Sequence, residues 1–135
     1  MNNIKYLELW QIRGLSDISF ISTLVGLENL FLQSLPNIEV LPNFTNLKKL
    51  RKIALENMKG LKDISSLEYA PSLIEFSHWS AMNMQVKDYI PLLKNPSLKR
   101  AAVGFGSNKR NNQFEEIAKE YHIDSEILWY NFPYE

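Results

Sequence analysis

Apolar residues recur along this chain at a fixed period, and this repetition constrains the fold more than any other feature. Leu27, Leu50 and Leu73 are each 23 residues apart, and the same step back from Leu27 leads to Ile4. In units counted from Ile4, apolar residues align at unit positions 1, 4, 6, 9, 12, 15, 18 and 21, and the first three units fill all eight. Such self-similarity indicates stacked coils that each bury an apolar edge against their neighbours.

The repetition weakens toward the C-terminus. The fourth unit is longer than the first three and places His78 where they have leucine, and the fifth keeps Ala101 and Val103 before the pattern ends. We therefore expect a repeat region over residues 1–105 and a C-terminal cap over residues 106–135. The five expected units lie near residues 4–26, 27–49, 50–72, 73–97 and 98–105.

Within each unit the spacing of apolar residues changes. Unit positions 4 and 6 alternate, as in a strand with one buried face. From position 6 onward apolar residues fall at every third place, which suits turns and short 3₁₀ or helical coils. The sequence thus predicts five short strands, stacked in chain order as a parallel sheet, with positions 4 and 6 pointing inward.

Unit positions 1 to 6 carry an LxxLxL pattern. The segments are Ile4–Leu9, Leu27–Leu32 and Leu50–Leu55, with a degenerate version at Leu73–His78. Because the pattern recurs in phase over roughly residues 4–105, the chain resembles the leucine-rich repeat family. The resemblance implies an α/β solenoid, with a curved parallel sheet on its concave face, short 3₁₀, helical or irregular convex coils and a C-terminal capping helix. The family often has asparagine at unit position 9, but this chain has Ile12, Leu35 and Met58 there, so we expect no asparagine ladder.

A helix is predicted after the polar loop of residues 106–111. Its apolar residues follow the i, i+3, i+4, i+7 spacing of one helical face. They are Phe114, Ile117, Ala118 and Tyr121. Asn111 or Asn112 suits the N-cap, and the helix should cover the last strand. The aromatic tail, residues 127–134, is expected to pack on this cap, with docking elsewhere as the alternative.

The N-terminal end of the stack has no comparable cap in the sequence. Ile4 opens the first unit after only three residues, which leaves an apolar end and an unpaired strand edge. Two explanations remain open. Either the chain is a segment of a longer repeat protein, or a second copy or another domain covers this end, which would allow a homodimer.

Unit positions 3, 5 and 7 should point outward on the concave face. This face collects four aromatic side chains and charges of both signs, and Trp, Tyr and Arg dominate many protein interfaces. We therefore predict a non-enzymatic protein-binding module, a scaffold-type protein that binds a protein or peptide. The predicted contact residues are Tyr6, Glu8, Trp10, Phe31, Lys52, Glu56, Glu75, Trp79 and Arg100. The alternatives are that some aromatic residues only fill space, or that the chain is the C-terminal structural segment of a longer leucine-rich repeat protein.

The sequence offers little for catalysis, metals or cofactors. There is no cysteine, which excludes disulfides and thiolate ligands. His78 should point into the core as a hydrogen-bonded residue. An enzyme that uses His78 with Glu75, Ser77 or Ser80 is the weaker alternative, because Ser77 and His78 should point to opposite faces. We expect no catalytic residues, no metal and no cofactor.

Charge and hydropathy restrict the partners and the location. The 15 Lys and Arg residues balance 15 Asp and Glu residues, so neither nucleic acid nor an anionic membrane is an expected partner. No apolar run approaches the ~20 residues needed to span a bilayer. The polar start, Met1-Asn2-Asn3, does not resemble a signal peptide, and a cytoplasmic location is expected.

Asp17 and Asp63, at equivalent unit positions, are predicted to form turns.

Overall fold

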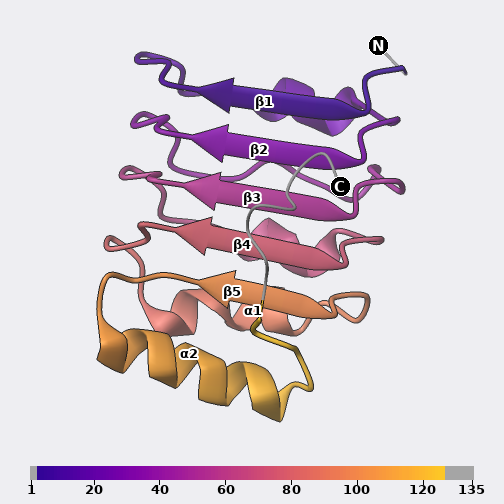
Figure 1. The fold of residues 1–135 in the computed structure, drawn as a ribbon. Coiled ribbons are helices and arrows are strands. Elements are labelled where there is room, and N and C mark those ends of the chain that lie inside the picture. The colour runs from indigo at the N-terminus through magenta and orange to yellow at the C-terminus, as the bar shows by residue number, and fades with distance from the viewer. Residues whose placement is uncertain (1–2, 127–135) are drawn as a thin grey trace.

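The structure, a computed structural model, describes residues 3–126 of the 135-residue chain. Five strands form one parallel sheet whose order follows the sequence (Figure 1). They are β1 (Tyr6–Trp10), β2 (Asn29–Gln33), β3 (Lys52–Glu56), β4 (Glu75–Trp79) and β5 (Arg100–Val103). The connections behind the sheet contain η1 (Ser19–Thr23), η2 (Ser65–Tyr69), η3 (Val86–Tyr89) and α1 (Ile90–Leu93), and α2 (Asn108–Glu120) follows β5. The predicted α/β arrangement, with a parallel sheet and a C-terminal helix, is confirmed.

The register of the sheet repeats the period of the sequence. Tyr6 pairs with Asn29, Asn29 with Lys52 and Lys52 with Glu75, so that each pairing advances the chain by one full period. The step from Glu75 to Arg100 is longer, and the connection it spans is the one that contains both η3 and α1. Equal unit positions therefore lie side by side on adjacent strands.

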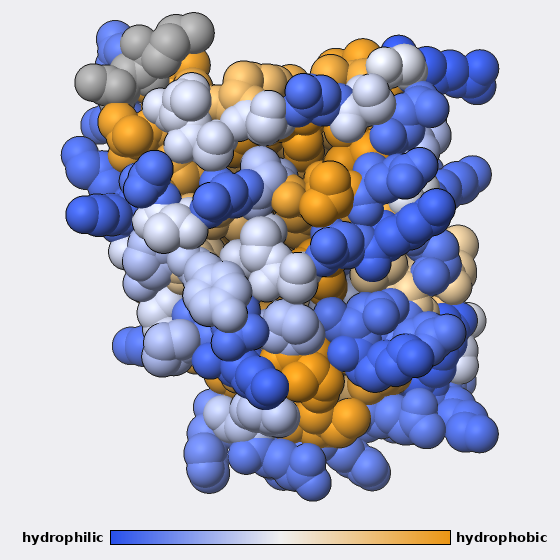
Figure 2. All heavy atoms as spheres, turned by 180° about the vertical axis from the view of Figure 1, so that it is seen from behind, coloured by the Kyte–Doolittle hydropathy of each residue, from blue (hydrophilic) through white to orange (hydrophobic). Residues whose placement is uncertain are grey.

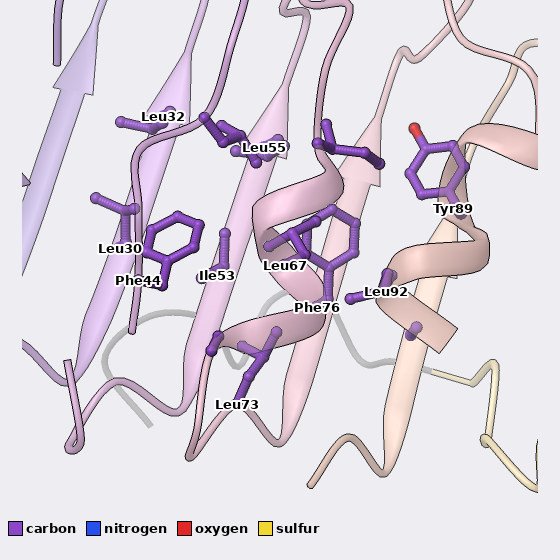
Figure 3. Packing of buried hydrophobic residues seen from close by; sticks show 14 of the residues in the cluster. Leu30, Leu32, Phe44, Ile53, Leu55, Leu67, Leu73, Phe76, Tyr89 and Leu92 are labelled. Carbon is purple, nitrogen blue, oxygen red and sulfur yellow. The ribbon is translucent and has the colours of Figure 1, made fainter. Parts of the chain in front are cut away.

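The core lies between the sheet and the connections. All eight apolar positions of the second and third units are buried, and leucine and phenylalanine side chains from successive coils pack against one another (Figure 3). Removing one such side chain from water contributes about 1.5–3 kcal/mol. The repeated inward positions therefore provide the main driving force for stacking.

Each unit of the sequence forms one coil of the stack, and the apolar side chains of the first coil, near residues 4–26, are less deeply buried than those of the second and third. Ile4, Leu7, Leu9 and Leu15 are only partly buried, and Ile12 is 39% exposed. Within residues 3–126, β1 pairs with β2 alone. A coil with one neighbour can bury only one of its two sides, which explains why the same unit positions are fully covered in the second coil.

Each of the first four strands is followed directly by a residue in the left-handed backbone conformation. Gln11, Ser34, Asn57 and Ser80 have φ angles between 52° and 59°. The first three donate their backbone N–H groups to the next strand, at 3.0 Å in each case. The turn costs about 1–2 kcal/mol for a non-glycine residue, and it directs the chain out of the sheet at the same place in every coil.

Position 9 is buried and apolar in the second and third coils, as expected without an asparagine ladder. Two asparagines at other positions nevertheless bridge coils. The Asn83 amide donates to the carbonyl oxygens of Met58 and Leu61 at 3.1 and 3.0 Å. Buried Asn95 donates to the carbonyls of Leu67 and Ala70, both at 2.8 Å.

The cap begins earlier than predicted. Ser107 is the N-cap of α2, and its hydroxyl accepts a hydrogen bond from the Arg110 N–H. The expectation that Asn111 or Asn112 caps the helix is wrong, since the Asn111 side chain accepts instead from the N–H of Phe105 at 2.8 Å. Of the predicted apolar face, Phe114 and Ala118 are buried. Tyr121 lies beyond the last helical residue and is exposed.

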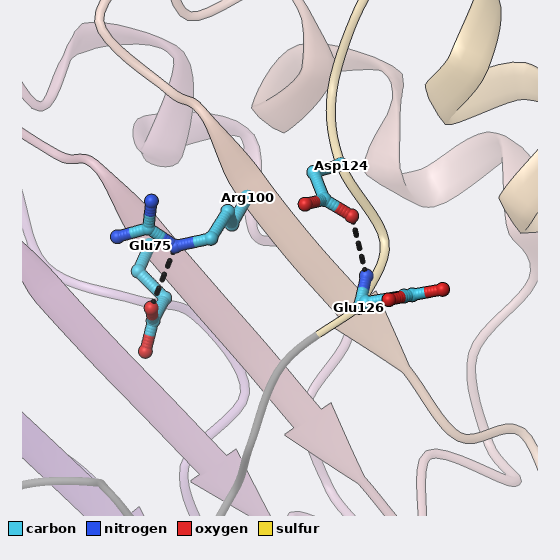
Figure 4. A network of polar contacts seen from close by, with 4 residues as sticks. All are labelled: Glu75, Arg100, Asp124 and Glu126. Atoms are coloured by element: carbon cyan, nitrogen blue, oxygen red, sulfur yellow. Dashed lines mark hydrogen bonds and ion pairs between the residues drawn. The ribbon is translucent and has the colours of Figure 1, made fainter.

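The segment after α2 returns to the open edge of β5. Asp124 donates its N–H to the carbonyl of Lys99, and its carbonyl accepts from the N–H of Ala101, at 3.0 and 2.9 Å. Its side chain accepts from the Glu126 N–H, close to the Arg100–Glu75 pair (Figure 4). The predicted packing of residues 127–134 concerns a segment outside the described residues.

Surface hydropathy on the side opposite the strands is mixed, with apolar residues at separate places among hydrophilic ones (Figure 2). The exposed large apolar residues of the connections include Phe20, Val40 and Tyr69. None of the helices within residues 3–126 has the length and apolar character needed to cross a membrane.

Candidate binding face of the sheet

The side chains at unit positions 3, 5 and 7 form what we call the outer sheet face. The register aligns them in three rows across the strands. The first row is Tyr6, Asn29, Lys52, Glu75 and Arg100. The second row is Glu8, Phe31, Ala54, Ser77 and Ala102. The third row is Trp10, Gln33, Glu56, Trp79 and Gly104.

Aromatic side chains lie at both ends of this face. Tyr6 and Trp10, on the edge strand β1, are 49% and 53% exposed. Phe31 and Trp79 are half-buried, because β2 and β4 have neighbours on both sides. The Trp79 ring lies against Gly104, where an added Cβ would be 3.0 Å from the indole Cε3. The glycine, which directly follows β5, therefore leaves room for the indole ring of Trp79.

Charged and amide groups surround these rings. Arg100 Nε donates to Glu75 Oε1 at 3.0 Å (Figure 4). Gln33 Nε2 donates to Glu56 Oε2 at 3.4 Å. Predicted contact residues Glu8, Lys52, Glu56 and Glu75 are each partly exposed. The structure thus brings all nine predicted contact residues to one face of the sheet.

Small side chains form the floor of the face. Ala54, Ser77 and Ala102 are buried between larger neighbours. Asn29 is only 2% exposed, and neither its amide nitrogen nor its amide oxygen has a hydrogen-bond partner. An unsatisfied buried amide costs about 1–3 kcal/mol. The Asn29 amide therefore has unused hydrogen-bonding capacity. Asn29 lies in the first row, between Tyr6 and Lys52.

His78 lies in the core, on the opposite side of β4 from Ser77. Its Nδ1 is 2.7 Å from the Tyr89 hydroxyl, and its Nε2 has no partner. Burial lowers the pKa of His78 to about 4, and burial together with Asp88 raises the pKa of Tyr89. Both side chains are fully buried, so a dissolved substrate does not reach them in this structure. The expectation of a hydrogen-bonded core histidine is confirmed.

Asp17 and Asp63 form the predicted turns. Each side chain accepts a hydrogen bond from the N–H group two residues later, at 2.9 Å. Backbone and side-chain hydrogen bonds from Ser19 lower the pKa of Asp17, and side-chain and backbone hydrogen bonds from Ser65 lower that of Asp63. Within residues 3–126, no group of three or more His, Asp and Glu side chains is placed to hold a metal ion.

A second surface feature was not predicted from the sequence. A hollow of about 400 Å³ lies where β1, β2 and β3 end. We call it the strand-end groove, and its lining residues are Gln11, Arg13, Ser34, Pro36, Asn57 and Lys59. The available signal was the recurrence of polar residues at unit position 8 and of Arg13 and Lys59 at unit position 10.

Comparison of the chain with protein-family models, with curated proteins and with solved structures found no match.

Proposed function

We propose that this chain is a leucine-rich repeat solenoid that binds a protein or peptide, without catalysis, on the outer sheet face as its concave surface. The observation that carries the proposal is the exposure of Tyr6 and Trp10 on β1, on the same face as the half-buried rings of Phe31 on β2 and Trp79 on β4. Aromatic anchors surrounded by charged groups are typical of the residues that contribute most to interface affinity. The LxxLxL segments on which the family resemblance rests overlap the first four strands of the sheet.

The regular sheet supports this function physically. The outer sheet face is attached to five strands in continuous register, and a fully packed core lies beneath β2, β3 and β4. A preformed surface loses less conformational entropy on binding than one that must order itself. Because the aromatic residues of the outer sheet face lie on β1, β2 and β4, this face favours a ligand that lies across several strands.

The test is a selection of displayed random peptides against the folded chain, followed by measurement of Kd for the selected peptides. The triple variant Trp10→Ala, Phe31→Ala and Trp79→Ala should bind at least about tenfold more weakly, a loss of about 1.4 kcal/mol or more. The matched control is the double variant Phe20→Ala and Tyr69→Ala, which removes exposed aromatic rings from the connections. Thermal melts establish that both variants fold. Unchanged affinity in the triple variant would contradict the proposal.

The partly exposed first coil supports a second candidate function. Ile4, Leu7 and Leu9 occupy positions that are fully buried in the next coil, so a preceding coil would bury them equally well. In this view the chain is the C-terminal structural segment of a longer repeat protein. We then expect mass spectrometry of the native product to give a mass well above 15.7 kDa. A native product of 15.7 kDa that sediments as a dimer would instead assign this end to a second copy.

A further inference from the structure

The strand-end groove combines features of an anion-binding surface that the outer sheet face lacks. Arg13 and Lys59 are exposed, and neither makes a hydrogen bond or an ion pair within the described part of the chain. None of the residues that line the groove is acidic. The groove therefore carries a formal charge of about +2 on a chain whose net charge is zero.

The backbone holds the groove in a defined shape. The left-handed residues Gln11, Ser34 and Asn57 place their side chains next to one another, and Asn57 Nδ2 donates to Ser34 Oγ at 3.0 Å. Next to them the second and third coils approach so closely that a Cβ at Gly60 would clash with the Pro36 carbonyl oxygen. Asn37 Oδ1 also accepts from the Gly14 N–H at 2.8 Å. Bonds between coils thus hold the backbone around the groove and the side chains of Ser34 and Asn57 in place.

The spacing of the two chain positions that carry Arg13 and Lys59 matches a repeat distance of an extended peptide. Arg13 and Lys59 occupy the same unit position two coils apart, with Pro36 between them. Adjacent coils are separated by about 4.8 Å, so the two positions are about 10 Å apart. A polyproline II segment has three residues per turn and rises about 3.1 Å per residue. Residues i and i+3 of such a segment therefore lie on the same side, about 9 Å apart.

We propose that the strand-end groove binds an acidic peptide segment in the polyproline II conformation, with carboxylates at i and i+3 paired to Arg13 and Lys59. A polyproline II backbone has no internal hydrogen bonds, so its carbonyls can accept from the side chains of Gln11, Ser34 and Asn57, which line the same groove beside the two basic residues. The inference rests on the proposed function for its premise that the partner is a polypeptide. Three residues of the groove directly follow the third row of the outer sheet face in the chain: Gln11 follows Trp10, Ser34 follows Gln33 and Asn57 follows Glu56. The groove is therefore continuous with the outer sheet face.

The experiment is a titration of the ¹⁵N-labelled full chain with the peptide acetyl-Glu-Pro-Pro-Glu-Pro-Pro-amide, followed by NMR. Amide signals of Arg13, Ser34, Asn57 and Lys59 should shift, and the shifts should decrease as salt is raised. Arg13→Gln and Lys59→Gln should each weaken binding about threefold. Lys62→Gln is the matched control, because Lys62 is an exposed lysine outside the groove that pairs with Glu39. This variant should bind like the original chain.

Three results would overturn the inference: no shifts at the groove, equal shifts with the Gln-Pro-Pro-Gln analogue, or unchanged binding by the Arg13→Gln, Lys59→Gln double variant. The proposed function fails separately. If library-selected peptides depend on Trp10, Phe31 and Trp79 while the acidic peptide leaves the groove unshifted, only the groove inference is wrong. If the acidic peptide binds the groove but no selected peptide depends on the outer sheet face, the proposed function is wrong and the groove stands.

Discussion

Lowering the pH from 6.5 to 4 is expected to remove about 3 kcal/mol of folding stability through His78 alone. In the unfolded chain the histidine has its ordinary pKa of 6.5, whereas burial lowers the pKa in the folded chain to about 4. Between these two values the unfolded state binds a proton that the folded state does not. The stability is therefore complete above the unfolded pKa and is lost as the pH falls toward the folded pKa.

The measurement is urea unfolding at intervals between pH 7 and pH 4. The control is the double variant His78→Leu, Tyr89→Phe, which removes the titrating group and the hydroxyl that would lose its 2.7 Å partner. Leucine occupies the same unit position in the first three coils, so the replacement suits the site. Hydrogen bonds from Ser19 and Ser65 lower the pKa values of Asp17 and Asp63, and because both aspartates are present in the original chain and in the double variant, their contribution is the same in the two series. If the double variant loses stability as steeply as the original chain, the assignment to His78 is wrong.

Replacing Asn95 with alanine is expected to cost about 3 kcal/mol of stability. The buried side chain makes two hydrogen bonds to carbonyls of the preceding coil, and its oxygen accepts from the N–H and hydroxyl of Ser97 at 2.9 and 2.8 Å. Each buried hydrogen bond contributes about 1 kcal/mol, and unsatisfied groups add to the loss. Chemical denaturation at pH 7 measures the effect.

Two further variants separate the roles of this amide. Asn95→Asp keeps the oxygen that accepts from Ser97 but loses the donors to Leu67 and Ala70, and should therefore be at least as destabilising as the alanine variant. Asn43→Ala is the matched control, because exposed Asn43 accepts from Thr45 in a similar turn and has no side-chain bond to another coil among the described residues. It should cost less than about 1 kcal/mol. Equal losses for Asn43→Ala and Asn95→Ala would show that only the local turn matters.

Much of the fold could be predicted from the spacing of apolar residues. The repeat period identified the strands, and the alternation of positions 4 and 6 predicted which side chains point inward, including His78. The start of the cap was less predictable. Ser107 and Asn111 are both good N-cap residues, and two hydrogen bonds in the folded chain decide between them, from the Arg110 N–H to the Ser107 hydroxyl and from the Phe105 N–H to the Asn111 side chain.

The sequence could predict which residues belong to the candidate binding face, but not how exposed each of their side chains is. Alternation along a strand assigned the nine residues to one side of the sheet. It could not predict that Tyr6 and Trp10 are half exposed while Trp79 lies against Gly104. Exposure depends on the size of neighbours on adjacent strands, and those neighbours are a full repeat away in the chain.

The sequence by itself determined the number of coils, the order of the strands and the inward and outward faces, because each is set by a period that every coil repeats. Only the tertiary structure decided which unique side chains meet, within a coil or between coils. The His78–Tyr89 bond, the Asn95 bridge and the approach of Pro36 to Gly60 all depend on residues that break the repeat. A periodic pattern specifies what coils have in common, whereas contacts between non-repeated residues depend on side-chain reach after the coils have stacked.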